Sequence, residues 1–199
     1  AESFNYGLKK FLEEARTLAQ IDHSNVVRVR DFFEENGTAY LVMDYYEGLT
    51  LSEYLERIKN GFLPGKQALA IIMPILDGLK EVHEKGFLHR DIKPHNIYLT
   101  SKNTPILLDF GAARQAMGEK SSSMSVVLSE GYAPLEQYQR NGKQGAWTDV
   151  YGAAATLYTM LTGRVYPSPL DQINDPDWEI EEPLPRSDSD YYLHMQAIT

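Results

Sequence analysis

The stretch His-Arg-Asp-Ile-Lys-Pro-His-Asn-Ile-Tyr-Leu-Thr-Ser-Lys-Asn-Thr-Pro-Ile-Leu-Leu-Asp-Phe-Gly spans residues 89–111. Two acidic residues, Asp91 and Asp109, each end or follow a short apolar run, and Lys93 and Asn96 lie between them. A carboxylate, an amine and a carboxamide are the groups needed to hold a divalent metal, phosphate oxygens and an attacking hydroxyl together. The residue types therefore indicate phosphoryl-transfer chemistry.

This stretch resembles the catalytic loop and the metal-binding loop of protein kinases, which read His-Arg-Asp-x-Lys-Pro-x-Asn and Asp-Phe-Gly. The resemblance implies that Asp91 accepts and orients the substrate hydroxyl, and that Lys93 neutralises the γ-phosphate of ATP. It also implies that Asn96 and Asp109 bind Mg²⁺, a hard cation that prefers oxygen ligands. Lysine at position 93 further favours a serine or threonine acceptor over tyrosine. The similarity covers nearly the whole chain, from residue 8 to about residue 164.

The composition excludes several other classes of function. The 199 residues are 43% hydrophobic and 24% charged, as in ordinary soluble globular proteins. The formal net charge of -9 argues against a nucleic-acid binder, because Lys and Arg are not concentrated to neutralise phosphates. The chain has no cysteine, which excludes disulfides and thiolate zinc sites and is compatible with a cytoplasmic location. No apolar run approaches the roughly 20 residues of a membrane span, so we expect none in this chain.

Residues 7–20 predict a helix, because apolar side chains recur at three- and four-residue spacing. At about 100° per residue, Glu14 lies at the edge of this apolar stripe, beside Phe11 and Leu18. A carboxylate that points toward a core needs a partner. That partner is either Lys10, four residues back, or, as the resemblance implies, a lysine on the preceding strand. In the second case Glu14 is the inward glutamate of the kinase helix αC.

Two β-rich runs, residues 26–33 and 38–43, flank the dipeptide Asn-Gly at positions 36–37. This pattern is a strong hairpin signal. In the kinase interpretation the two runs are strands of a partial small lobe, residues 1–43. Residues 44–48 then form the hinge to the large lobe.

The resemblance also implies which residues bind ATP. Met43 takes the gatekeeper position. The backbone groups of Asp44 and Tyr46 hydrogen-bond adenine in this family, and Tyr98 is expected to contact the nucleotide as well. Together with Glu14, these residues form the expected nucleotide-binding set.

Two long helices are expected in the large lobe, which we assign to residues 49–199. The first, residues 66–85, contains Pro74, which should bend the helix or separate its first half. Its inward side chains are expected to be Leu69, Ile72, Met73, Leu76, Leu79 and Val82. The second helix, residues 147–162, is apolar almost all round and therefore belongs in the middle of a core. Residues 164–190 are rich in proline and acidic residues without any period, which predicts a long surface loop.

Residues 112–130 lack periodicity and are rich in serine, which indicates a flexible polar loop. The resemblance makes this loop part of an activation segment, residues 109–136. Counting back from Glu136, Ser129 takes the place of the threonine that touches the catalytic aspartate and lysine of the family. The sequence Gly-Tyr-Ala-Pro-Leu-Glu-Gln-Tyr at 131–138 is of the kind associated with bacterial members.

Two further residues have a structural interpretation. His83 is expected to be a packed histidine near a helix end rather than a metal ligand. Asp149, in the first turn of the second long helix, suits the positive end of the helix dipole. The resemblance adds that Asp149 holds the backbone of the catalytic loop, residues 89–96.

These observations predict an α+β, protein-kinase-like fold. Its large lobe is mostly helical, and the small β lobe is represented only by helix αC and two strands. The expected function is that of a Ser/Thr protein kinase, which uses ATP and Mg²⁺ to phosphorylate a hydroxyl of a protein substrate. The alternative is a catalytically silent pseudokinase that acts as a binding or scaffold module. Retention of Asp91, Lys93, Asn96 and Asp109 favours the kinase, because a silent module has no physical need for all four.

Two parts of a complete kinase have no counterpart in these 199 residues. Nothing upstream of Leu8 can form the Gly-rich phosphate loop, and no Val-Ala-Ile-Lys strand is present. We therefore expect a longer parent sequence, truncated here at both ends, to supply these parts. The 199 residues by themselves are expected to have weak or no activity.

Overall fold

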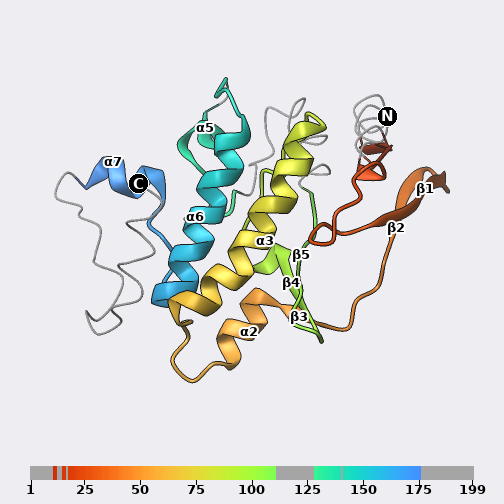
Figure 1. The fold of residues 1–199 in the computed structure, drawn as a ribbon. Coiled ribbons are helices and arrows are strands. Elements are labelled where there is room, and N and C mark those ends of the chain that lie inside the picture. The colour runs from red at the N-terminus through yellow and green to blue at the C-terminus, as the bar shows by residue number, and fades with distance from the viewer. Residues whose placement is uncertain (1–10, 13–14, 17, 111–127, 140, 176–199) are drawn as a thin grey trace.

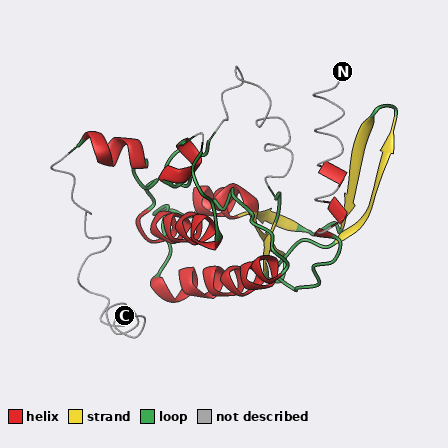
Figure 2. Cartoon of the chain, turned by 90° about the horizontal axis from the view of Figure 1, so that it is seen from above, coloured by secondary structure: helices red, strands yellow, loops and turns green. Residues whose placement is uncertain are grey.

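The structure is a computed structural model, and it describes residues 11–12, 15–16, 18–110, 128–139 and 141–175. A mainly helical body lies beside a β hairpin that projects away from it (Figure 1 and Figure 2). Helices α3 and α6 run side by side through the body, and a three-stranded sheet lies next to α3 (Figure 1). The α+β architecture predicted from the sequence is therefore confirmed. The elements are β1 (Val29–Glu35), β2 (Thr38–Met43), β3 (Gly48–Thr50), α2 (Leu51–Arg57), α3 (Gly65–Glu84), η1 (Pro94–Asn96), β4 (Ile97–Thr100), β5 (Pro105–Leu107), α5 (Leu135–Tyr138), α6 (Ala146–Thr162) and α7 (Pro169–Asn174).

The predicted hairpin is present as β1 and β2, which pair antiparallel out to Val29 and Met43. Asn36 and Gly37 both have positive φ, 53° and 71°. A two-residue turn with positive φ at both positions matches the right-handed twist of the flanking strands. The Asn-Gly dipeptide therefore fixes the register of this hairpin.

The predicted first strand of the hairpin begins too early. Val26 does not pair with β2 but forms a parallel bridge with Leu107 of β5, and the N–H of Val27 donates to the carbonyl of Leu107 at 2.9 Å. Both valines are buried. Packing against the body, rather than the continuity of the β-rich run, thus decides where the hairpin starts.

Helix α3 is one uninterrupted element, so Pro74 does not separate its first half. The predicted inward stripe is wrong at Met73, which is 53% exposed. The reason is that α3 is apolar almost all round near its middle, so periodicity alone could not select the buried face. Gly78 marks that face, because a Cβ added there would lie only 3.0 Å from the side chain of Val26. The residues of α3 that are buried are Ala68, Ile71, Ile72, Ile75, Gly78, Leu79 and Val82.

Helix α6 packs against α3 and the catalytic loop, but it is not buried on every side as predicted. Trp147 and Val150 are 60% and 52% exposed. On the opposite face, a Cβ added to Gly152 would lie 2.9 Å from Cβ of Ile92, so the small residue permits close approach to the loop. Gly163 ends the helix in the left-handed conformation, with φ 70°, as the sequence indicates.

The predicted surface loop after α6 contains a short helix, α7, which the sequence analysis missed. Ser168 caps it: its Oγ accepts from the N–H of Asp171, and the Asp171 carboxylate accepts from the Ser168 N–H and hydroxyl. This Ser-x-x-Asp spacing is a local helix-start signal. The sequence of residues 191–199 also has a helix-like pattern, and this stretch lies outside the described residues.

We expect the core to respond sharply to Met160→Ala and weakly to Met73→Ala. Met160 is fully buried at 0% exposure, whereas Met73 is 53% exposed. Loss of a buried methionine side chain costs about 2–5 kcal/mol of unfolding free energy, and a surface change stays within about 0.5 kcal/mol. Urea denaturation of both variants measures the two values. Equal losses would contradict the placement of α6 in the core.

Candidate active site

The backbone of the catalytic loop is held by the carboxylate of Asp149 on α6. Its Oδ2 accepts the N–H of His89 at 2.9 Å, and its Oδ1 accepts the N–H of Arg90 at 2.6 Å. Nε2 of His83, on α3, lies 2.7 Å from Oδ2. Because a carboxylate can only accept, this histidine nitrogen carries the proton. The Asp149 carboxylate thus accepts hydrogen bonds from two backbone N–H groups of the catalytic loop and from one histidine side chain on α3.

Arg90 has a positive φ of 68°, in the left-handed region. For a residue other than glycine this conformation costs about 1–3 kcal/mol and persists only where the surroundings impose it. The hydrogen bond to Asp149 supplies one such constraint. The catalytic loop is therefore locally strained immediately before Asp91.

His89 is completely buried, with 0% exposure. Its Nε2 lies 2.7 Å from the carbonyl of Leu108, and its Nδ1 accepts the N–H of Asp91 at 3.3 Å. These contacts assign the ring proton to Nε2. Burial lowers the pKa of His89, which keeps the ring neutral and is consistent with this tautomer. The ring centroid lies 4.7 Å from that of Phe110.

Four side chains of the expected catalytic set meet at Asp91. The Ser129 hydroxyl donates to Oδ1 of Asp91 at 2.7 Å, and Nδ2 of Asn96 donates to Oδ2 at 2.9 Å. Lys93 Nζ lies 3.0 Å from the same Oδ2 and donates to Ser129 Oγ at 2.7 Å. The Asp91 side chain is 11% exposed and that of Lys93 is 14% exposed. The carboxylate is therefore fixed in orientation while still reaching the surface.

The residues expected to hold Mg²⁺ fit a hard cation in their chemistry. Nδ2 of Asn96 donates to the carbonyl and the carboxylate of Asp91, which leaves the amide oxygen as the atom for a cation. Asp109 is exposed and has φ 46°. The described residues contain no cluster of three or more His, Cys, Asp or Glu side chains suited to a metal. Two protein ligands supplemented by phosphate oxygens and water are the usual arrangement for Mg²⁺.

The expected hinge residues lie between the hairpin and the three-stranded sheet. Asp44 forms a two-point ion pair with Arg30, at 2.5 and 2.8 Å, and this hydrogen bonding lowers the pKa of the Asp44 carboxyl. The Tyr98 hydroxyl donates to the carbonyl of Tyr46 at 3.1 Å, which ties the hinge to β4. Met43 is 40% exposed. The structure thus brings Tyr46 and Tyr98 together.

Phe110 connects the body to the N-terminal part of the chain. It packs against the large core of the body and also against a smaller cluster that includes Leu18 and Val29. The ring of Phe110 also contacts the ring of His89, as their centroid distance of 4.7 Å shows. The two remaining expected features, Glu14 and the serines between 112 and 127, lie outside the described residues.

Sequence reasoning missed two contacts made by the segment after Ser129. Thr148 donates its hydroxyl to the Glu136 carboxylate at 2.8 Å, and Gln137 donates Nε2 to the carbonyl of Arg90 at 2.8 Å. Both join segments that are separated along the chain, so no local spacing reveals them. The residue types gave a partial signal, because a carboxamide and a neighbouring glutamate close to the catalytic loop need hydrogen-bond partners.

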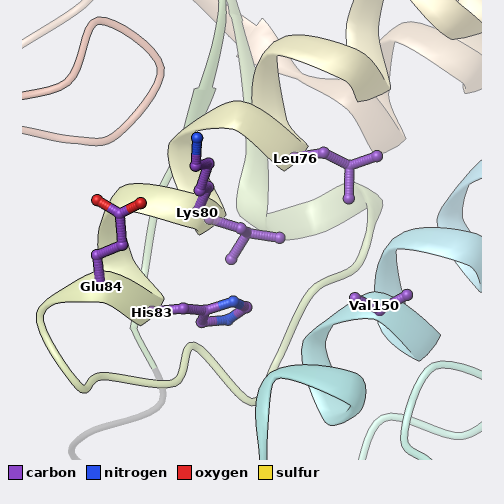
Figure 3. A pocket seen from close by; sticks show the side chains of 6 residues that line it. Leu76, Lys80, His83, Glu84 and Val150 are labelled. Atoms are coloured by element: carbon purple, nitrogen blue, oxygen red, sulfur yellow. The ribbon is translucent and has the colours of Figure 1, made fainter.

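A surface pocket lies between α3 and α6 (Figure 3), and its lining residues are not those of the cluster at Asp91. His83 forms part of its wall, with Lys80 and Glu84 from the same helix and Val150 from α6 (Figure 3). His83 is therefore a packed histidine that bonds to Asp149 on one side and borders the pocket on the other.

Known proteins share both the sequence and the fold. The family described as protein kinase domain matches residues 2–184. The chain belongs to the protein kinase family. PrkC of Bacillus subtilis is 34% identical over 161 residues, and PknL of Mycobacterium tuberculosis is 33% identical over 156 residues. Both of these relatives are named serine/threonine-protein kinases.

The matches cover most of this kinase chain but only part of each relative. They include 81% of this chain and 24% of PrkC, and 78% of this chain and 39% of PknL. Among solved structures, PpkA-294 in its apo form gives a TM-score of 0.78 at 35% identity, over 89% of this chain and 62% of that one. The PknI kinase domain of Mycobacterium tuberculosis gives 0.65 at 26% identity, over 82% and 58%. These neighbours confirm the predicted protein-kinase-like fold.

We expect the neutral state of His89 to make the kinase domain lose stability in mild acid. Its pKa in the folded chain lies below the unfolded value of about 6.5, so the unfolded state binds more protons as the pH falls through that value. The matched variant is His89→Phe, which keeps an aromatic ring but cannot titrate. Chemical denaturation from about pH 7.5 to 5.5 should show the stability advantage of the wild type over the variant shrinking. An advantage that grows in acid would mean that His89 is charged when folded.

Proposed function

We propose that this chain carries the catalytic centre of a Ser/Thr protein kinase, which transfers the γ-phosphoryl group of ATP to a serine or threonine hydroxyl of a protein substrate. The observation that carries the proposal is the hydrogen-bonded cluster of Asp91, Lys93, Ser129 and Asn96. Phosphoryl transfer needs positioned reactants and cancelled charge rather than covalent help from the protein. This cluster offers a fixed carboxylate beside a fixed cation.

In this proposal Asp91 orients the substrate hydroxyl and accepts its proton. Three donors hold the Asp91 carboxylate, so its orientation does not have to be found anew in each turnover. Lys93 places a positive charge beside the acceptor and neutralises the γ-phosphate. Asn96 and Asp109 would hold the magnesium ion of the nucleotide. When bound, magnesium-ATP supplies the phosphoryl group and offsets the charge that develops on it.

The adenine end of ATP is assigned to the hinge. The Tyr98 hydroxyl donates to the carbonyl of Tyr46, which occupies that acceptor. We therefore assign the N–H of Tyr46 as the group that hydrogen-bonds adenine. The carbonyl of Asp44 is the matching acceptor, since its N–H already donates to Arg28. Met43 would border the base as gatekeeper, and Glu14 would take part through a strand lysine. Tyr98 would contact the nucleotide from β4.

The same proposal divides the chain into a partial small lobe at residues 1–43, a hinge at 44–48 and a large lobe at 49–199. It also makes this chain a piece of a longer kinase, because no Gly-rich phosphate loop and no strand lysine occur in its 199 residues. By itself the 199-residue chain would then transfer phosphate slowly. That absence also favours the second candidate, a silent pseudokinase that binds partners without phosphoryl transfer.

The substrate and the location follow from the proposed chemistry. A protein with an accessible serine or threonine is the partner, and the acidic chain is not built to bind nucleic acid. None of the helices in the described ranges has the length and apolar character needed to cross a membrane. We place the domain in the cytoplasm, where ATP is available and where proteins rarely depend on disulfides, as this cysteine-free chain does not.

The first test is phosphate transfer by the wild type and by Asp91→Asn, with Asp31→Asn as the control on an exposed aspartate of the hairpin. We expect a weak signal from radiolabelled ATP to a Ser/Thr peptide library. Removal of the catalytic base should lower it at least about 100-fold. The Asp31→Asn control should keep the wild-type signal. Equal incorporation by wild type and Asp91→Asn would exclude the kinase proposal for this chain.

A second test measures nucleotide binding apart from turnover. At a tenfold excess over Kd, magnesium-ATP should stabilise the wild type by about 1.4 kcal/mol. That value corresponds to a rise in Tm of about 3–6 °C for a domain of this size. Asp109→Asn should lose the magnesium-dependent part of the shift. A shift without any transfer would support the pseudokinase, and an unchanged magnesium dependence in Asp109→Asn would remove Asp109 from the metal site.

A further inference from the structure

We propose that Gln137 is a positioning residue, which holds the peptide that links Arg90 to Asp91 and thereby fixes the direction of the Asp91 side chain. The inference rests on the proposed kinase function for its catalytic consequence. Its structural basis is a single contact between two distant segments: Nε2 of Gln137 donates to the carbonyl of Arg90 at 2.8 Å. A carbonyl can only accept, so the amide nitrogen of Gln137 is the atom that faces it.

The peptide between Arg90 and Asp91 is held at both of its polar atoms. The side chain of Gln137 donates to the carbonyl of Arg90, and the ring nitrogen Nδ1 of His89 accepts the N–H of Asp91 at 3.3 Å. The second bond is long, and its acceptor is itself fixed through Nε2 to the carbonyl of Leu108. The stronger restraint on this peptide plane is therefore the one from Gln137.

The strain at Arg90 explains why a second restraint is needed. Asp149 holds the N–H of Arg90, which restricts rotation on the φ side, where the angle is 68°. That contact does not set ψ, the rotation that aims the carbonyl and carries the Cα of Asp91. A contact to a polar atom of the following peptide does so, and the shorter of the two such bonds is the one from Gln137 to the Arg90 carbonyl. Without it, the strained residue could relax by turning the Asp91 peptide.

Gln137 is well placed to act as a fixed point, because α5 is anchored to α6. Thr148, a residue of α6 that is 2% exposed, donates its hydroxyl at 2.8 Å to the carboxylate of Glu136, which directly precedes Gln137. Upstream on the same segment, the hydroxyls of Tyr132 and Thr159 lie 3.0 Å apart. The N–H of Gln137 also donates to the carbonyl of Pro134 at 3.0 Å.

The same segment therefore holds Asp91 from two directions. Ser129 donates to the carboxylate of Asp91, and Gln137, eight positions later, holds the backbone that precedes it. A displacement of this segment would release the side chain and the peptide together. Gln137 thus links the conformation of the segment to the geometry of the proposed catalytic base.

The test compares Gln137→Met, which keeps the length of the side chain but has no N–H, with Gln139→Met, the same change at an exposed position two residues along. Gln137→Glu, which places an acceptor against the carbonyl, is the more severe variant. NMR hydrogen exchange at the Asp91 amide measures the local restraint, whether or not the chain is catalytically active. Steady-state phosphate transfer measures the effect of that restraint on catalysis.

We expect exchange at Asp91 to be about two- to tenfold faster in Gln137→Met, as for the loss of one hydrogen bond, and faster still in Gln137→Glu. We expect kcat to fall about 10- to 100-fold with the KM for ATP unchanged, because misplacement of the base affects the reaction rather than nucleotide binding. Gln139→Met should match the wild type in both measurements.

Unchanged exchange in Gln137→Met would overturn the proposal, as would faster exchange with an unchanged kcat in an active kinase. A loss of ATP affinity in proportion to kcat would point to general damage instead and also contradicts it. If the wild type shows no Asp91-dependent transfer, the proposed function and the catalytic consequence fail together, and the exchange data still decide whether Gln137 holds the peptide.

Discussion

The carboxylate of Asp149 is almost completely removed from solvent, with 1% of the residue exposed. An ionised group in such a place is tolerated only if donors surround it. Here the donors come from two backbone N–H groups of the catalytic loop and from His83 on α3. Helix α3, the loop that follows it and helix α6, which lies about 60 residues further along the chain, must therefore meet at one point. Removing any one of them would leave a buried charge short of partners.

The placement of Asp91 follows from this meeting point through short steps. Arg90 takes its left-handed conformation against Asp149, and the next residue is Asp91. The absence of a side chain at Gly152 lets α6 approach the loop, since a Cβ there would press on Ile92. Side-chain contacts from Lys93 and from the segment after residue 128 then fix the carboxylate itself. Packing thus sets the backbone, and hydrogen bonds set the reactive group.

The parts that could be predicted from sequence are those in which chemistry requires fixed residue types at fixed spacing. Asp91, Lys93 and Asn96 lie within six residues, and the Asn-Gly turn likewise imposes its own geometry. The parts that could not be predicted depend on tertiary contacts. Near Met73 the helix α3 offers apolar residues on every side, so only the neighbouring elements decide which face is buried. The bond from Gln137 joins segments 47 residues apart and leaves no local pattern.

The two sides of the proposed site differ in how firmly the described residues hold them. On the acceptor side, the Asp91 carboxylate is 11% exposed and bonds to three side chains, all within the helical body. On the nucleotide side, Asp109 is exposed and Met43, at the end of the hairpin, is 40% exposed. Exposed groups with few packed neighbours move at lower free-energy cost than buried, bonded ones. In the proposed site the body therefore holds the Asp91 carboxylate in a fixed position, whereas Asp109 and Met43 can move at a lower free-energy cost.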